Sequence, residues 1–179
     1  MMQMNLALGA AVAEALVQPS IPSLEALQKE WLKRVHSNHY HLHAVKHSLL
    51  QLYGRLQEKK ENKDATHWEE IAKKEKCCKE FLLVCSKIDP SMGYTIPYVG
   101  LTFYEYHKTI VQNAKRNYGL AQIDEHQLKK RMLLAKALLK KAMDIFKNEA
   151  EDTPEGQLFN TCRQEAVSIG SWMLAVGLV

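Results

Sequence analysis

The segment from residue 128 to residue 146 places the strongest constraint on the fold. Because an α-helix completes a turn every 3.6 residues, apolar side chains at steps of 4, 3, 4, 3 and 4 residues gather on one face. Asp124 stands just before the segment, where a short acidic side chain can cap a helix. The pattern predicts a long amphipathic helix that packs against a neighbour. Its apolar positions are Leu128, Met132, Ala135, Leu139, Ala142 and Phe146.

Similar spacing along the rest of the chain predicts an all-α fold. Glycine and proline, which interrupt helices, number only 8 and 5 among 179 residues, and no segment alternates long enough to indicate a sheet. The other helices are expected over 23–34, 38–54, 66–89, 98–117 and 154–169. The expected caps are Ser23, Ser37 or Asn38, and Thr66 with Glu69 as a capping box, and the expected ends are Gly54, Asp89-Pro90 and Gly119.

Two apolar stripes define the core faces expected in the first half of the chain. One follows residues 42–56 at alternating steps of 3 and 4, and the other follows residues 68–85. The first stripe consists of Leu42, Val45, Leu49, Leu52 and Leu56. The second consists of Trp68, Ile71, Ala72, Cys78, Leu82 and Cys85.

Proline and glycine positions suggest how the chain is divided. Pro19, Ser20 and Pro22 interrupt an Ala- and Leu-rich start, so residues 1–22 are interpreted as a detachable lead-in. Residues 23–170 form the expected helical domain, and 171–179 an apolar tail. Within the domain, Tyr-Gly pairs recur 65 residues apart and prolines recur 64 residues apart. Antiparallel helical hairpins, stacked like tetratricopeptide (TPR) units, would produce this echo, and chance similarity between two hairpins is the alternative.

Histidines cluster in residues 36–47, which hold five of the eight in the chain. His39, His43 and His47 lie four residues apart on one helical face, where three imidazoles could hold a metal ion. No carboxylate or cysteine completes the set, so solvated histidines on a helix flank are the favoured interpretation, and no metal site is predicted. Partial protonation of this row could also tune an association.

Aromatic and basic residues supply the candidates for partner binding. Residues 94–106 hold five of the fourteen aromatic side chains, which serve either as helix packing or as interface anchors. Lys129, Lys136, Lys140 and Lys147 are expected to face away from the apolar face of residues 128–146, either towards solvent or towards an acidic partner. Tyr98, Tyr104 and Lys136 are the candidate partner-binding residues. The five aromatic residues are Tyr94, Tyr98, Phe103, Tyr104 and Tyr106.

Composition and motifs exclude several functional classes. The net charge of +4 is too small to indicate nucleic-acid binding, and the apolar stretches 4–17 and 172–179 are shorter than the roughly 20 residues that a membrane helix needs. No basic residue precedes the first stretch, which argues against a secretory signal. The four cysteines form no C-x-x-C pair, which favours a reduced, intracellular setting, cytoplasmic or nuclear or both.

Catalytic motifs are missing from the sequence. It holds no G-x-G-x-x-G, phosphate-binding loop, G-x-S-x-G or H-E-x-x-H pattern. We therefore expect no enzyme complete within this chain, no catalytic residues and no bound cofactor.

Two stretches resemble a known family. Residues 36–54, His-Ser-Asn-His-Tyr-His-Leu-His-Ala-Val-Lys-His-Ser-Leu-Leu-Gln-Leu-Tyr-Gly, are similar to the helix that follows the SET region in SET-and-MYND (SMYD) lysine methyltransferases, especially those of arthropods. Thr153-Pro154-Glu155-Gly156 resembles the S/T-P-E-G junction near the end of that family. Ser37 replaces the family's usual proline. The resemblance covers about residues 23–168, which leaves residues 1–22 outside it.

The resemblance implies a non-catalytic role. In the family, this region is a TPR-like helical domain that walls the substrate cleft and receives protein partners. S-adenosylmethionine and zinc belong to the SET, MYND and post-SET parts, whose motifs do not occur here. The chain is then expected to be a fragment, a truncated isoform or a partial gene model of such an enzyme.

Three functions stay open at this point. The first is a protein-interaction module of a SMYD-type methyltransferase that binds partners along a helix-lined groove. The second is a helical regulator that binds metal through the histidines of residues 39–47. The third is a basic helical protein that contacts RNA, whose affinity would fall steeply with salt.

Overall fold

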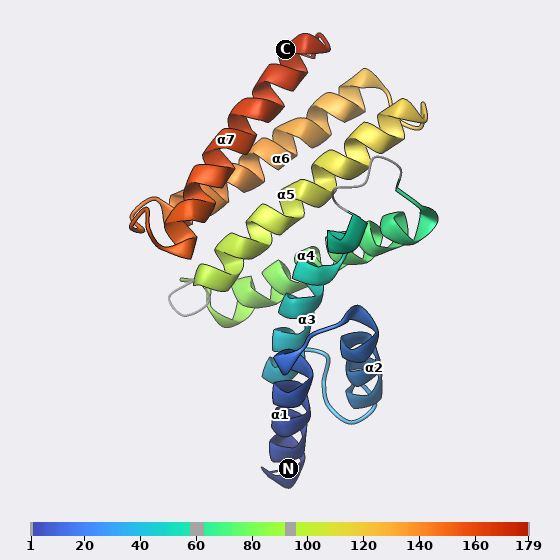
Figure 1. The fold of residues 1–179 in the computed structure, drawn as a ribbon, viewed down its shortest axis with the longest axis vertical. Coiled ribbons are helices and arrows are strands. Elements are labelled where there is room, and N and C mark those ends of the chain that lie inside the picture. Colours follow the sequence, from blue (N-terminus) through green and yellow to red (C-terminus); the bar gives the residue numbers. More distant parts are fainter. Residues whose placement is uncertain (1, 58–62, 92–95, 179) are drawn as a thin grey trace. The chain divides into compact units, whose positions relative to one another are not determined.

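The computed structural model describes residues 2–57, 63–91 and 96–178, and all regular structure in them is helical. The predicted all-α class is therefore confirmed for these residues. The described residues form seven α-helices and one short 3₁₀ helix, and Figure 1 shows how the α-helices follow one another along the chain. They are α1 (Met2–Val17), α2 (Ile21–Trp31), α3 (Tyr40–Leu52), η1 (Arg55–Gln57), α4 (Ala65–Ile88), α5 (Ile96–Gly119), α6 (Glu125–Phe146) and α7 (Pro154–Ala175).

The chain divides into two compact units, Met1–Val84 and Cys85–Val179, and each is described by itself. In the first unit, α1 and α2 both pack against α3, which supplies the centre of the core. Leu8 and Val12 of α1 are buried there, so one face of the segment that the sequence analysis separates as a lead-in contributes to this core. The reason is that one stripe of α1 is apolar enough to cover α3. The core residues are Leu8, Val12, Leu24, Trp31, Leu42, Val45, Leu49 and Tyr53.

Three helix starts differ from the predicted caps. Ser20, rather than Ser23, caps α2, because Pro22 fits the first helical turn and lets the helix begin earlier. The His39 side chain, rather than Ser37 or Asn38, accepts from a backbone N–H at the start of α3. At the start of α4, Asp64 accepts from the N–H of His67, a role expected of Thr66. Several short polar residues adjoin each start, so the neighbouring packing selects one.

The predicted end of α3 is confirmed at Gly54. This glycine has φ +76°, the left-handed conformation that follows many helices. An added Cβ would also lie 2.6 Å from Cδ1 of Ile71 in α4, so a side chain at this position would require Ile71 to shift. The chain turns here, which leaves Leu56 exposed and ends the predicted stripe at Leu52.

The buried face of α4 differs in part from its predicted stripe. Ile71, Cys78 and Cys85 are buried as expected, whereas Ala72 is exposed. Trp68 and Leu82 are half-buried. The face also includes four residues that the predicted stripe omitted, which are His67, Lys74, Phe81 and Val84. The helix ends at Ile88, immediately before Asp89-Pro90, as predicted.

In the second unit, α5, α6 and α7 lie side by side as antiparallel neighbours (Figure 1). All six predicted apolar positions of residues 128–146 are buried, none more than 3% exposed. Asp124 and Gln127 form a reciprocal capping box at the start of α6, as the cap prediction for Asp124 requires. The predicted packing helix is confirmed in both its extent and its face.

The ends of α5 and α7 are further along the chain than predicted. Gly119 is still helical, and the left-handed residue is Ala121, at φ 53°. The α7 helix continues through Gly170 to Ala175, so the expected end at Ile169 was wrong. Buried Ile169 and Met173 on either side of Gly170 outweigh the cost of a glycine within a helix, about 1 kcal/mol. Residues 171–175 of the expected apolar tail are therefore the last turn of α7.

The Thr153-Pro154-Glu155-Gly156 junction has a local structural role. Thr153 Oγ1 accepts a hydrogen bond of 3.0 Å from the N–H of Gly156, and Pro154 occupies the first helical position, as predicted. A Cβ added to Gly156 would lie 2.0 Å from the carbonyl oxygen of Ala150. The glycine therefore lets the loop before α7 approach the helix closely.

Candidate functional site

The three candidate partner-binding residues lie at different places in the second unit. Tyr98 is 54% exposed in the first turn of α5. Lys136 is exposed on α6, and its Nζ atom lies 3.8 Å from the position of a Cβ added to Gly170 of α7. Tyr104 is half-buried on α5 and bonds to α7. Tyr104 belongs to a hydrogen-bonded cluster that joins two helices.

This cluster consists of Tyr104, His107 and Glu165. The Tyr104 hydroxyl donates to Glu165 Oε1 at 2.9 Å, and His107 Nε2 lies 2.5 Å from Glu165 Oε2. The other ring nitrogen, Nδ1, faces the carbonyl oxygen of Tyr104. His107 is 1% exposed, whereas the Glu165 side chain is 36% exposed. The three side chains thus tie α5 to α7.

His107 and Glu165 were not among the site residues predicted from the sequence. Glu165 follows Cys162 by three residues and precedes Ile169 by four, and both of these neighbours are buried. A carboxylate on that apolar stripe was a signal that it has a partner, since a buried charge is costly when unpaired. Nothing in the sequence names the partner, which comes from another helix 58 residues away.

Both ring nitrogens of His107 face oxygen atoms. A carbonyl oxygen can only accept, so Nδ1 must carry a hydrogen, and Nε2 faces the carboxyl group of Glu165. Burial alone would raise the pKa of Glu165, but the hydrogen bond and charge of His107, with help from Tyr104 and Lys108, hold that pKa below its usual value.

Two neighbouring groups are kept neutral by the same surroundings. Burial, followed by the negative charge of Glu165, raises the pKa of the Tyr104 hydroxyl. Burial and Glu165 also raise the pKa of the Cys162 thiol to about 12. A thiol in this state is a poor nucleophile, because the thiolate is the reactive form. Cys162 therefore acts as a small buried apolar residue.

A hollow of about 250 Å³ opens beside the cluster, and we call it the α5–α7 groove. At one end lie His107 and Glu165, and near the other end Lys115 Nζ lies 4.5 Å from the ring centroid of Trp172. Burial lowers the pKa of Lys115. The groove can thus offer ammonium donors and apolar contact to one side chain or short segment of a ligand. It is lined by His107, Lys108, Val111, Gln112, Lys115, Glu165, Ser168 and Ile169.

The histidines of residues 39–47 are neither solvated together nor assembled around one point. His39 Nε2 lies 3.1 Å from Asn5 Oδ1 of α1. His43 and His47 pack on the ring of Phe81 in α4, with centroids 5.7 and 5.4 Å away. The expectation of a solvated flank was wrong for these two because α4 covers that face. No group of three potential metal ligands occurs among the residues that the structure describes, so the metal-binding alternative gains no support.

Burial sets the protonation of this pair. It lowers the pKa of His47 to about 4, and it lowers the pKa of His43 with help from the charge of Lys46. Both ring nitrogens of His43 are buried, and within the described part of the chain neither has a hydrogen-bond partner. Lys46 itself is buried and pairs with Glu80 at 3.1 Å. The two histidines are therefore neutral packing residues at pH 7.

The other aromatic and basic candidates that the structure describes lie on α5, on α6 or immediately after α6. Tyr106 is buried, and Phe103 is half-buried beneath the ammonium of Lys141, 5.3 Å from its ring centroid. Tyr94 lies outside the described residues. The lysine row of α6 lies off the buried face, as predicted. Lys136, Lys140 and Lys147 are exposed and Lys129 is half-buried.

A scan against protein-family models and searches of the curated proteins and of the solved structures found no match to this chain. Among the described residues, no helix has both the length and the apolar character to cross a membrane.

Proposed function

We propose that the chain is a non-catalytic helical scaffold that binds a segment of a protein partner in the α5–α7 groove. The observation that carries the proposal is the cluster of Tyr104, His107 and Glu165 beside that groove. These polar atoms satisfy one another, so the cluster is suited to holding two helices in place rather than to moving protons. A pre-formed groove binds with a smaller entropic cost than a flexible one.

The shape and lining of the groove favour a peptide side chain as its occupant. Lys115 forms no ion pair within the described part of the chain, and its exposed side chain places the ammonium 4.5 Å from the ring centroid of Trp172. Lys108 adds a second positive charge on the same helix, one residue from His107. Val111 and Ile169 provide apolar surface between the two ends. An acidic or polar side chain next to an apolar one would complement this lining.

The resemblance to SMYD methyltransferases supports the same role. Each of the two stretches that carry the resemblance contains a helix cap, His39 for α3 and Thr153 for α7. A capping role is what we expect of residues that maintain a helical framework. We propose that the chain corresponds to the helical region of such an enzyme, with α5 and α6 as one hairpin and α7 as the start of the next. The distance from the start of α5 to the start of α7 is 58 residues, longer than the 34 of a standard TPR unit.

Methyl transfer tests the non-catalytic half of the proposal. The purified chain, incubated with labelled S-adenosylmethionine and histones or other proteins, should transfer no label. Robust transfer that depends on the chain would overturn the assignment.

Peptide display tests the binding half. A random peptide library selected on the chain should yield a family of peptides, and Lys115→Gln should weaken their binding about fivefold or more. Lys147→Gln is the matched control, because Lys147 is exposed outside the groove and the net charge changes equally. Failure to select any peptide, or equal binding by the two variants, would contradict the proposed groove.

A further inference from the structure

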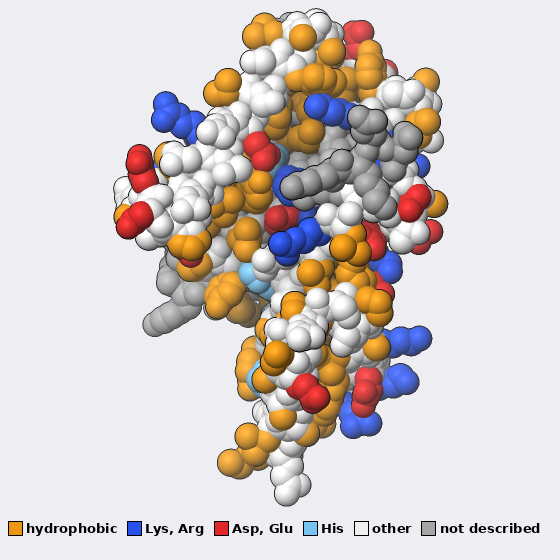
Figure 2. Space-filling view, viewed as in Figure 1, with side chains coloured by type: hydrophobic (Ala, Val, Ile, Leu, Met, Phe, Trp, Pro, Cys, Tyr) orange, Lys and Arg blue, Asp and Glu red, His pale blue; other side chains and the backbone are white. Residues whose placement is uncertain are grey.

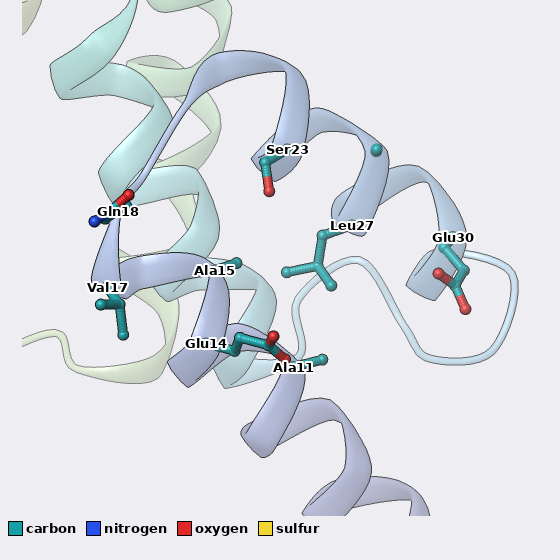
Figure 3. A pocket seen from close by; sticks show the side chains of 9 residues that line it. Ala11, Glu14, Ala15, Val17, Gln18, Ser23, Leu27 and Glu30 are labelled. Carbon is teal, nitrogen blue, oxygen red and sulfur yellow. The ribbon is translucent and has the colours of Figure 1, made fainter.

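A second hollow lies between α1 and α2 in the first unit, and we call it the α1–α2 groove. It has a volume of about 620 Å³. Figure 3 shows the side chains that line it, with Leu27 of α2 pointing into the space between the helices and Ala15 of α1 across from it. Both residues are half-buried and touch the core below. The groove therefore has an apolar floor.

The sequence explains why the two helices leave this space open. The larger apolar residues Leu8, Val12 and Leu24 point into the core that α3 shares with both helices. Three of the residues that line the groove between these positions are alanines, namely Ala11 and Ala15 on α1 and Ala26 on α2. Small side chains cannot fill the space between two diverging helices. The opening is thus large enough for more than one side chain of a ligand.

Carboxylates stand on both walls of the groove. Glu14 comes from α1 and Glu30 from α2, and both line the hollow (Figure 3). Glu14 forms no ion pair within the described part of the chain. Glu30 lies 3.5 Å from Arg34, but both side chains are more than half exposed, so this contact is weak and easily exchanged. Figure 2 shows acidic side chains over α1 and α2 with hydrophobic side chains around them and basic side chains along one edge.

We propose that the α1–α2 groove binds a basic amphipathic peptide segment of a partner protein. An apolar side chain of the partner would rest on Leu27 and Ala15, and a lysine or arginine on either side would pair with Glu14 and Glu30. This arrangement follows the common mode in which an amphipathic helix lays its apolar face in a groove and its charges complement the rim. The proposal goes beyond the function assigned to the α5–α7 groove, because it concerns another unit and a partner of opposite charge.

Designed peptides provide the probe. One fluorescent 14-residue helical peptide carries leucines at steps of 3 and 4 with flanking lysines, and a matched peptide carries glutamates in place of the lysines. Fluorescence anisotropy of the full chain with each peptide should give saturable binding of the basic peptide alone. Raising the salt concentration should weaken it, since the rim charges are exposed.

Two variants locate the binding site. Glu14→Gln with Glu30→Gln should weaken binding of the basic peptide about fivefold to tenfold, the effect of losing two exposed charge pairs. Glu149→Gln with Glu151→Gln is the matched control, because both residues are exposed in the loop before α7 and the net charge changes equally. Ala26→Trp, at an exposed position, should fill the groove and block binding with both carboxylates intact. Circular dichroism melts should show that all variants fold.

Three results would overturn the proposal. They are no saturable binding of the basic peptide, equal binding of the acidic peptide, or equal weakening of binding by the control pair of substitutions. If the Glu14 and Glu30 variant instead changes the oligomeric state without changing peptide affinity, the groove is occupied by a second copy of the chain. Loss of peptide binding by Lys115→Gln but not by the groove variants would place the binding in the other unit.

Discussion

His107 Nε2 lies 2.5 Å from Glu165 Oε2, while the second ring nitrogen of His107 faces a backbone carbonyl. One buried imidazole is thereby held between two acceptors, on a helix 58 residues from the carboxylate. The pair joins α5 to α7 at the edge of the α5–α7 groove. Removal of this pair should therefore lower the stability of the second unit and weaken the hold between the two helices that form the groove.

Truncation of Glu165 should destabilise the second unit. Glu165→Ala leaves the His107 ring and the Tyr104 hydroxyl without their acceptor, and we expect a loss of about 2 kcal/mol in the free energy of unfolding, reduced from a fully buried case by the partial exposure of Glu165. Tyr104→Phe removes one hydrogen bond and should cost about 1 kcal/mol. Urea denaturation followed by circular dichroism measures both, and equal effects of the two variants would show that the imidazole is not tied to this carboxylate.

Acid should destabilise the first unit through His47. Its pKa is about 4 in the folded chain against an ordinary 6.5, so between these values the unfolded chain binds more protons and stability falls as the pH falls. We expect a loss of about 3 kcal/mol between pH 7.5 and pH 4 from this residue. His47→Gln should lack that part of the pH dependence. Urea denaturation at a series of pH values tests this, and an unchanged slope in the variant would refute it.

Glu165 should contribute to the pH dependence of stability in a lower pH range than His47 does. The depressed pKa of Glu165 means that its stabilising contribution is present above its ordinary value of 4.5 and is lost as the pH falls below it. Glu165→Ala should therefore flatten the pH dependence of stability below about pH 4.5, measured by urea denaturation at a series of pH values. An unchanged pH dependence below pH 4.5 in the variant would refute this prediction.

The turn after α5 should become more stable with glycine at position 121. Ala121 has φ 53°, and hydrogen bonds from Ala121 to Tyr118 and from Gln122 to Asn117 complete the helix end around it. Ala121→Gly should add about 1 kcal/mol to the free energy of unfolding, because alanine is strained in the left-handed region. Thermal unfolding measures the gain, and a loss of stability would mean that the residue is not left-handed.

The same substitution at two glycines should have opposite effects. Gly156→Ala would place a Cβ 2.0 Å from the backbone oxygen of Ala150, so we expect a loss of about 2 kcal/mol or more. Gly119→Ala lies within α5 with no atom within 4 Å of the added Cβ, and it should gain about 0.5–1 kcal/mol. Equal signs in urea denaturation would contradict the structure of one of these helix ends.

Regular patterns made α6 predictable and α4 only partly so. The six apolar residues of α6 repeat without a gap, so both its face and its capping box followed from sequence. In α4 the buried positions include His67 and Lys74, whose polar atoms made them look exposed. Their burial depends on neighbouring elements, which a single helix pattern does not describe. For the same reason the packing of His43 and His47 on Phe81 was not foreseen.

The sequence alone determined that this chain is helical, where most helices lie and which face of α6 is buried, because these properties depend on spacing and capping within a few turns. Only the tertiary structure decided that α1 belongs to the core, that His107 meets Glu165, and that small residues of α1 and α2 leave a groove with two carboxylates. Each of these joins residues of different helices. Such contacts depend on how whole helices pack against one another, and the periodicity within one helix does not predict them.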